Sequence, residues 1–304
     1  MWKRLVLALC CFFVLSSVPA LADGLAVPEK KGTRARSLIG SPVNANLAGG
    51  GTLPKGAGVT MLNASFADRT RGKRGGGPDS FGQVYLLKTR YGLSNSFELG
   101  VVLPYINNRR SGHPSGPDHI EGLGDMTVQI TWAPLNRHQQ DPLSLSFGAG
   151  LLLPTGIYGK NHLPGNGVFG GRLVGAVSWW PTNDIRMDAE VIWTGPFERG
   201  NQRVKRGQQW QWNAFARYLF DNVDIGIESA ITHAESGDKS FDWGETRNLR
   251  NGYTEWLVGP SMNVALDSLG VWGGLGVFFP LVQDVKGPSK VEDVRFEFKL
   301  GKVW

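Results

Sequence analysis

From residue 54 to the end of the chain, apolar and polar residues alternate with a period of two in one segment after another. Residues 184–194 are typical, because Ile185, Met187 and Val191 share one face and Arg186 and Glu190 share the other. Such alternation predicts a β-strand with one apolar and one polar face. We predict twelve strands, near residues 56–66, 81–91, 96–106, 123–134, 142–154, 168–180, 184–195, 208–220, 223–234, 253–266, 269–280 and 291–304.

The predicted connections alternate in length. The short ones lie at 92–95, 135–141, 181–183, 221–222 and 267–268, and the long ones at 67–80, 107–122, 155–167, 196–207, 235–252 and 281–290. Short turns at one end and long loops at the other indicate an outer-membrane barrel. A soluble β-sandwich also has alternating strands but gives no reason for loops sorted in this way. We therefore expect an all-β fold, a transmembrane antiparallel up-and-down β-barrel of twelve strands over residues 54–304, with both termini in the periplasm.

The first 22 residues have the features of a secretory signal peptide. Lys3 and Arg4 precede an apolar run over residues 5–15, and Ala20-Leu21-Ala22 forms a small-x-small cleavage site. The apolar run is shorter than the about 20 residues of a transmembrane helix. We expect cleavage after Ala22 and delivery to the outer membrane of a Gram-negative-type bacterium.

Residues 23–53 lack strand periodicity and are polar, basic and rich in glycine. Two interpretations remain open for this stretch. It is a disordered periplasmic tail, or it folds back into the barrel as a plug.

Composition and charge exclude several classes of function. Both cysteines, Cys10 and Cys11, lie in the signal peptide, so the mature chain has no thiol for a disulfide, a metal site or nucleophilic catalysis. The net charge of +6 for the full chain is modest, and no basic helix points to nucleic acid.

Four short motifs resemble a known family. They are residues 91–105 (YGLSNSFELGVVLPY), 122–125 (GLGD), 153–156 (LPTG) and 279–288 (FPLVQDVKGP). In this order they are similar to the outer-membrane transporters associated with the meta-cleavage pathway of phenol degradation. The resemblance covers roughly residues 54–304. It implies an outer-membrane barrel that moves hydrophobic or aromatic compounds, and it carries no catalytic signature.

The polar face of each strand would line the barrel interior if the apolar face contacts lipid. Eight strands are usually filled by side chains and sixteen leave an open channel, so twelve predict a narrow or gated path. Two interpretations of the interior charges remain open. They form ion pairs that fill the barrel and hold its shape, or they line a polar conduit and determine its selectivity. The lumen-lining candidates are Lys88, Arg90, Glu98, Asp125, Arg172, Arg186, Asp188, Glu190, Arg217, Glu228, Glu255, Arg295 and Glu297.

The function predicted is an outer-membrane channel or transporter for small solutes, with hydrophobic or aromatic compounds suggested by the family resemblance. The alternative is a structural or lipopolysaccharide-binding barrel without transport. The expected partners are outer-membrane lipid, lipopolysaccharide at the basic outer loops, a small-molecule solute and the barrel-assembly machinery. The predicted assembly signal is the final strand, with Phe296, Phe298, Leu300 and Trp304 on one face.

Enzymatic chemistry is not expected. A hydrolase needs a nucleophile beside a base, and the pair His113 and Ser115 lies in a loop rich in glycine and proline. The HExxH zinc motif and the phosphate-binding P-loop are both missing from the sequence. We predict no catalytic, cofactor-binding or metal-binding residues.

Overall fold

The fold is described from a computed structural model of the chain. The structure describes residues 50–70, 80–110, 119–136, 143–156, 165, 167–182, 184–197, 204–205, 207–240, 246–248, 252–285 and 291–304. Within these residues, no helix has both the length and the apolar character needed to cross a membrane.

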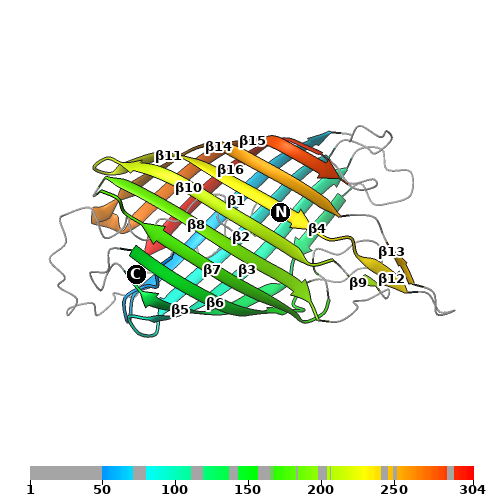
Figure 1. The fold of residues 1–304 in the computed structure, drawn as a ribbon, viewed down its shortest axis with the longest axis horizontal. Helices are drawn as coiled ribbons and strands as arrows, with labels where there is room; N and C mark the ends of the chain where they lie inside the picture. The colour runs from blue at the N-terminus through cyan, green and yellow to red at the C-terminus, as the bar shows by residue number, and fades with distance from the viewer. Residues whose placement is uncertain are drawn as a thin grey trace.

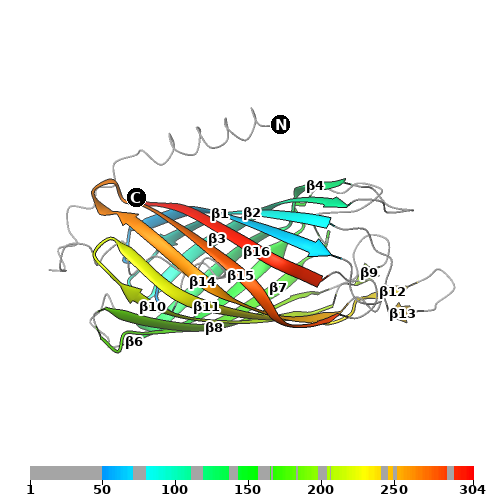
Figure 2. The ribbon, with the colours of Figure 1, turned by 90° about the horizontal axis from the view of Figure 1, so that it is seen from above.

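The described residues form one closed antiparallel sheet of twelve positions (Figures 1 and 2). Each strand pairs with its neighbours along the chain, and the first strand pairs with the last to close the ring. One position is shared by two successive strands, β4 and β5, which both pair with β3. The predicted fold class is thereby confirmed. The strands are β1 (Gly58–Thr70), β2 (Ser80–Gly92), β3 (Phe97–Arg110), β4 (His119–Leu123), β5 (Met126–Leu135), β6 (Leu143–Leu153), β7 (Gly170–Trp179), β8 (Ile185–Pro196), β10 (Gln209–Leu219), β11 (Val223–Ala234), β14 (Tyr253–Leu266), β15 (Val271–Val285) and β16 (Val291–Val303).

The fourth barrel position differs from the continuous strand predicted over residues 123–134. It is interrupted at Gly124 and Asp125, between β4 and β5. Gly122 has a φ of 150°, in a region that favours glycine, and the backbone N–H of Gly124 donates to the carbonyl of Pro104 at 2.9 Å. The interruption therefore turns the chain without separating it from β3.

The two ends of the barrel differ in their connections. The end with short turns also holds the chain's C-terminus, and the turn between β14 and β15 contains the 3-10 helix η3 (Asp267–Leu269). At the opposite end, β9 (Val204–Lys205), β12 (Asp238–Ser240) and β13 (Thr246–Asn248) form a separate three-stranded sheet (Figure 1). The sequence did not predict this sheet, because strands of two or three residues are too short to show periodicity.

The barrel is apolar outside and polar inside. Ile227 and Leu173 are 65% and 55% exposed on the outer surface, whereas Lys88 and Glu228 are each 1% exposed. A chain in water would bury the first pair and expose the second. In a bilayer the apolar surface contacts hydrocarbon and the polar side chains face the lumen. The alternation along each strand therefore produces two surfaces of opposite character.

Aromatic side chains gather on the outer surface toward both ends of the barrel. At the short-turn end Tyr91 stacks on Trp304 with ring centroids 6.0 Å apart. Toward the opposite end Phe66 packs against Phe81 and Tyr85. Two such girdles mark the interfaces between hydrocarbon and water in spanning barrels. They locate the lipid-facing band between them.

Candidate functional site in the barrel lumen

The structure places most of the predicted lumen residues on the inward faces of the strands, with little of each side chain exposed. Asp125 differs, because it lies in the interruption between β4 and β5 and its Oδ1 accepts a hydrogen bond of 3.2 Å from the backbone N–H of Gly156. It holds the loop after β6 rather than standing in a strand. Ten candidates are less than a tenth exposed: Lys88, Arg90, Glu98, Arg186, Asp188, Glu190, Arg217, Glu228, Glu255 and Glu297; Arg172 and Arg295 are intermediate.

Toward the short-turn end, arginines and carboxylates on neighbouring inward positions form hydrogen-bonded ion pairs. Arg186 binds Asp188 through two nitrogens, with Nε to Oδ2 at 2.7 Å and Nη2 to Oδ1 at 2.9 Å. Arg90 binds Glu98 in the same bidentate way. Buried charges are tolerated when they are paired with good geometry and further hydrogen bonds. These ion pairs place hydrogen-bonded charge in this part of the lumen, although the buried Nη1 of Arg90 has no hydrogen-bond partner among the described residues.

Arg217 is the most heavily paired of these arginines. Its Nη1 donates to Asp224 Oδ1 at 3.0 Å and its Nη2 donates to Glu228 Oε1 at 2.5 Å. Its guanidinium carbon lies 4.6 Å from the ring centroid of Phe215, which is inward-facing and 6% exposed. Asn263 supplies a further donor to Asp224 at 2.6 Å. The alternation of β10, β11 and β14 brings all these groups to one wall.

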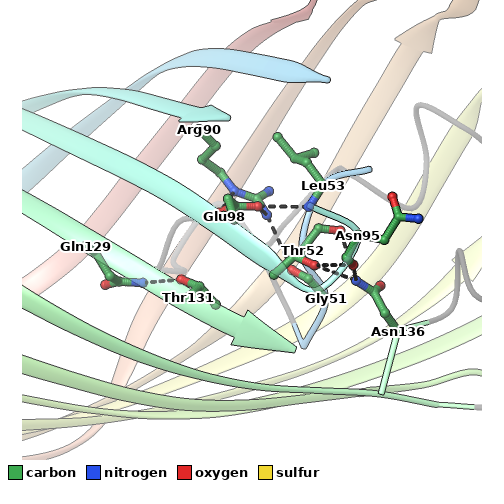
Figure 3. A network of polar contacts seen from close by, with 9 residues as sticks. All are labelled: Gly51, Thr52, Leu53, Arg90, Asn95, Glu98, Gln129, Thr131 and Asn136. Atoms are coloured by element: carbon green, nitrogen blue, oxygen red, sulfur yellow. Dashed lines mark hydrogen bonds and ion pairs between the residues drawn. The ribbon is translucent and has the colours of Figure 1, made fainter. Parts of the chain in front are cut away.

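Residues 50–53 lie against the inner wall at this end (Figure 3). The backbone N–H of Leu53 donates to Glu98 Oε2 at 3.0 Å, and Thr52 accepts from Asn136 Nδ2 at 2.6 Å. At the other end of the segment, the N–H of Gly50 donates to Ser178 Oγ at 2.7 Å. The segment thus joins β3, the end of β5 and β7 from within the barrel.

Two of these segment residues depend on close packing. A Cβ on Gly50 would stand only 2.4 Å from the carbonyl oxygen of Ser144, so no larger residue fits without a shift. Leu53 is fully buried in an apolar cluster with Val59, Met61, Ala265 and Trp272. The inward-facing Trp272 also lies under Lys299, whose Nζ is 4.8 Å from its ring centroid. Apolar packing and hydrogen bonds therefore hold the same short segment.

In the middle of the lumen, charged side chains from well-separated strands act on one another. Lys88 of β2 and Arg172 of β7 lie within electrostatic range of Glu190 on β8. β8 is five positions from β2 in the ring of twelve formed by the described strands, so Lys88 and Glu190 come from nearly opposite walls, whereas Arg172 comes from the strand next to β8. Lys299 of β16 interacts with Glu228 of β11, which is three positions away. Charges in the interior therefore act on one another across several strands.

Toward the long-loop end the ion pairing is more exposed. Arg295 of β16 binds Glu255 at 3.1 Å and Glu292 at 2.8 Å, and its side chain is 19% exposed. Gln283 Nε2 donates to Glu255 Oε1 at 3.1 Å. The cluster joins β14, β15 and β16, and partial exposure screens its charges more than those of Arg217, which is 1% exposed.

The lumen also has apolar inward positions that the sequence analysis did not identify. Leu257 and Phe278, at 1% and 0% exposure, pack with Ala230. Val174 and Ile192 are a directly opposed pair on β7 and β8, at 6% and 2% exposure. The two-residue repeat could have identified these inward positions, because Leu257 lies on the same face of its strand as Glu255 and Ile192 lies on the same face as Glu190.

The four predicted assembly residues lie on the outward face of the closing strand or just beyond it. Phe296 and Phe298 are 50% and 46% exposed, and Leu300 and Trp304 are intermediate. Trp304 Nε1 donates to Thr60 Oγ1 of β1 at 2.9 Å. The chain's final residue therefore bonds across the seam where the barrel closes.

In the described part of the chain, no cluster of three or more histidine, cysteine, aspartate or glutamate residues could hold a metal ion.

Comparison with solved structures gives the fold. An outer-membrane channel from Pseudomonas putida F1 superposes with a TM-score of 0.70 at 16% identity, over 86% of this chain and all of that one. The NanC porin gives 0.49 at 10% identity, over 80% and 98%. The β-domain of the Bordetella autotransporter BrkA gives 0.47 at 12% identity, over 82% and 100%.

No curated protein matches the chain. A family model does, over residues 79–278, and its description is "Putative MetA-pathway of phenol degradation". The matched region runs from β2 into β15 and covers well over half of the chain, in agreement with the resemblance found in the short motifs. The closed outer-membrane-type barrel is consistent with that match. The chain therefore belongs to the family described as the putative MetA-pathway of phenol degradation.

Proposed function

We propose that the protein is an outer-membrane channel for small solutes, hydrophobic or aromatic compounds among them. The observation that carries the proposal is the mixed inner wall. Apolar side chains such as Val174 and Phe278 face inward between charged groups that approach one another from facing strands. A lumen filled with side chains only to stabilise the barrel does not need both apolar and charged residues on its inner wall. Membership of a family linked to phenol degradation favours aromatic solutes.

The proposed channel includes an N-terminal plug. In this proposal residues 1–22 are a cleaved signal peptide, residues 23–53 form the N-terminal segment, and residues 54–304 form the barrel. The contacts of Gly50, Thr52 and Leu53 with Ser178, Asn136 and Glu98 support docking of the last part of this segment inside the barrel. For residues 50–53, these contacts favour a plug over a free tail.

We propose the lumen, rather than the wall, as the route. The wall glycines Gly274 and Gly276 could instead have marked a lateral gap. A Cβ on Gly274 would stand 2.1 Å from Asn263 Oδ1, and one on Gly276 would stand 2.7 Å from the ring of Phe278. Close packing against inward-facing side chains accounts for both glycines.

A structural barrel without transport is the second candidate. It is favoured by the buried ion pairs of Arg90, Arg186 and Arg217, which together with residues 50–53 occupy the short-turn end. In either case we propose that the barrel is surrounded by outer-membrane lipid and lipopolysaccharide, and that the basic outer loops bind the phosphate groups of lipopolysaccharide. Those loops, Arg69/Arg71/Lys73/Arg74 and Arg199/Arg203/Lys205/Arg206, fall almost entirely outside the described residues. We further propose that the barrel-assembly machinery recognises the final strand.

Planar-bilayer recordings and solute uptake into liposomes separate the two candidates. A channel gives discrete conductance steps, and replacement of both Glu190 and Arg217 by alanine changes their size and ion selectivity. A chain that folds in liposomes yet passes neither ions nor any aromatic solute, with or without these substitutions, contradicts transport.

A further inference from the structure

One carboxylate in the lumen is incompletely partnered. Glu190 is 7% exposed, and its Oε1 accepts a hydrogen bond of 2.5 Å from Asn213 Nδ2. Its Oε2 is buried and has no hydrogen-bond partner among the described residues. A buried acceptor left unmatched costs about 1–3 kcal/mol, and more when it is charged. Glu98, Asp188 and Glu228, by contrast, are held in hydrogen-bonded ion pairs.

On the β7 side, Glu190 borders apolar side chains. Ala176 lies directly opposite it in the pairing of β7 with β8, and Val174 and Ile192 form the next inward pair toward the long-loop end. All three side chains are less than a tenth exposed. The carboxylate therefore stands between this apolar surface and the polar side chain of Asn213, which lies directly opposite it on β10.

The facing wall offers a second apolar surface. On β2 and β3, Leu86 pairs with Pro104 and Val84 pairs with Ile106, on the inward face that also carries Lys88. Lys88 pairs with Val102 and lies within electrostatic range of Glu190. Lys88 thus links the two apolar surfaces across the lumen.

The charges near Glu190 restrict what can approach it. Lys88 and Arg172 balance its negative charge from two sides. A cationic solute would be repelled by these two groups, since like charges in a medium of low dielectric constant interact strongly. An anion has only acceptors and cannot donate to Oε2. A neutral hydroxyl group both donates and avoids the repulsion.

Resting on the channel function proposed above, we propose that Glu190 is a specificity-determining residue. Its Oε2 accepts a hydrogen bond from the hydroxyl group of a neutral solute whose apolar body lies between the surface of Val174, Ala176 and Ile192 and the surface of Leu86, Pro104 and Val102. The solute class is a small amphipathic alcohol or phenol-like molecule. The hydroxyl group is what distinguishes it from a pure hydrocarbon.

Equilibrium binding to the purified, folded chain in detergent micelles tests this without requiring transport. Fluorine NMR would compare para-fluorobenzyl alcohol, para-fluorotoluene and para-fluorobenzylamine, which is cationic at neutral pH. We expect the alcohol to bind about tenfold more tightly than either of the others, as a hydrogen bond to a charged acceptor implies. Equal affinities for alcohol and toluene in the unmodified chain would overturn the proposal.

Substitution then assigns the effect to the carboxylate. Glu190→Gln keeps the size of the side chain but removes its charge, and it should bring the affinity for the alcohol close to that for toluene, because an amide binds a hydroxyl group less tightly than a carboxylate does. Toluene binding should stay unchanged. Glu121→Gln is the matched control, because Glu121 is exposed on β4 near the outer rim. Leu86→Ala should weaken alcohol and toluene binding alike. A preference that survives Glu190→Gln overturns the assignment.

The two proposals fail differently. If the alcohol binds as described but no solute crosses liposomes, the channel function fails and the site stands as a binding site. If solutes cross but Glu190→Gln has no effect on binding preference, the channel stands and the site is wrong.

Discussion

The two ends of the lumen are built from the same alternation of inward residues but differ in how charge is satisfied. At the short-turn end Arg217 is 1% exposed and holds two carboxylates. Toward the long-loop end Arg295 also holds two carboxylates, but its side chain is 19% exposed. Water reaches the second cluster and screens it. The short-turn end therefore holds its charges in buried ion pairs, whereas the long-loop end holds them where water reaches.

The largest effect should follow from removing the buried cation. Arg217→Met leaves Asp224 and Glu228 buried without their partner, so the free energy of unfolding should fall by about 3–5 kcal/mol. Urea titration of the barrel in lipid vesicles would measure it. A loss below about 1 kcal/mol would mean that this end is hydrated and would remove the contrast between the two ends.

A smaller effect is expected where the N-terminal segment docks. Leu53→Ala deletes a fully buried side chain from the cluster around Trp272 and should weaken docking of the segment by about 2–3 kcal/mol. Faster proteolysis at residues 50–53, in a barrel whose gel mobility still shifts on heating, would report the release. An unchanged cleavage rate would show that hydrogen bonds alone hold the segment.

The partly exposed cluster should respond less than the buried one. Arg295→Met is expected to lower the free energy of unfolding by about 1–2 kcal/mol, because Gln283 still donates to Glu255 and the position of the lost guanidinium group is partly open to water. The same urea titration gives a direct comparison with Arg217→Met. Equal losses for the two variants would refute the distinction between the ends.

The smallest effect in this series concerns the seam and not the lumen. Deleting Trp304 removes its ring stack on Tyr91 and its hydrogen bond to Thr60, together worth about 1–2 kcal/mol. The folded fraction recovered from outer membranes should fall, as judged by heat-modifiable migration. Leu269→Ala, an exposed side chain at the same end, is the control. Undiminished recovery of the shortened chain would exclude Trp304 as an assembly signal.

The alternation of short and long connections distinguished a barrel from a sandwich, and the two-residue repeat assigned every side chain of a strand to one of two faces. The repeat also put Glu190 and Arg217 on the inner face without any knowledge of their partners. The pairing itself depends on the register between strands and on side chains that reach across the lumen, which one strand's pattern does not contain. Lys88 acting on Glu190 from nearly the opposite wall is the clearest case.

The sequence left the docking of residues 50–53 open, as one of two interpretations, and it did not identify the apolar inner surfaces. Gly50 and Leu53 donate hydrogen bonds from their backbone N–H groups. Almost every residue type has this donor, so the sequence does not indicate which residues use it. Ile192 and Leu257 are of the same residue types as those that face lipid. Only their position in the two-residue repeat identifies them as inward-facing. The predicted continuous fourth strand was wrong because the interruption at Gly124 and Asp125 depends on local backbone geometry.

The bond between Trp304 and Thr60 has a consequence for the order of synthesis and folding. It joins residues 244 positions apart, so the ring is completed only after the last residue of the chain is available. Such distant pairings form slowly, since the whole intervening chain must be ordered first. Residues 50–53 lie just before β1, inside the ring that this bond closes. They are therefore either enclosed as the two edge strands meet or threaded inward after the pairing of β1 with β16 has closed the ring.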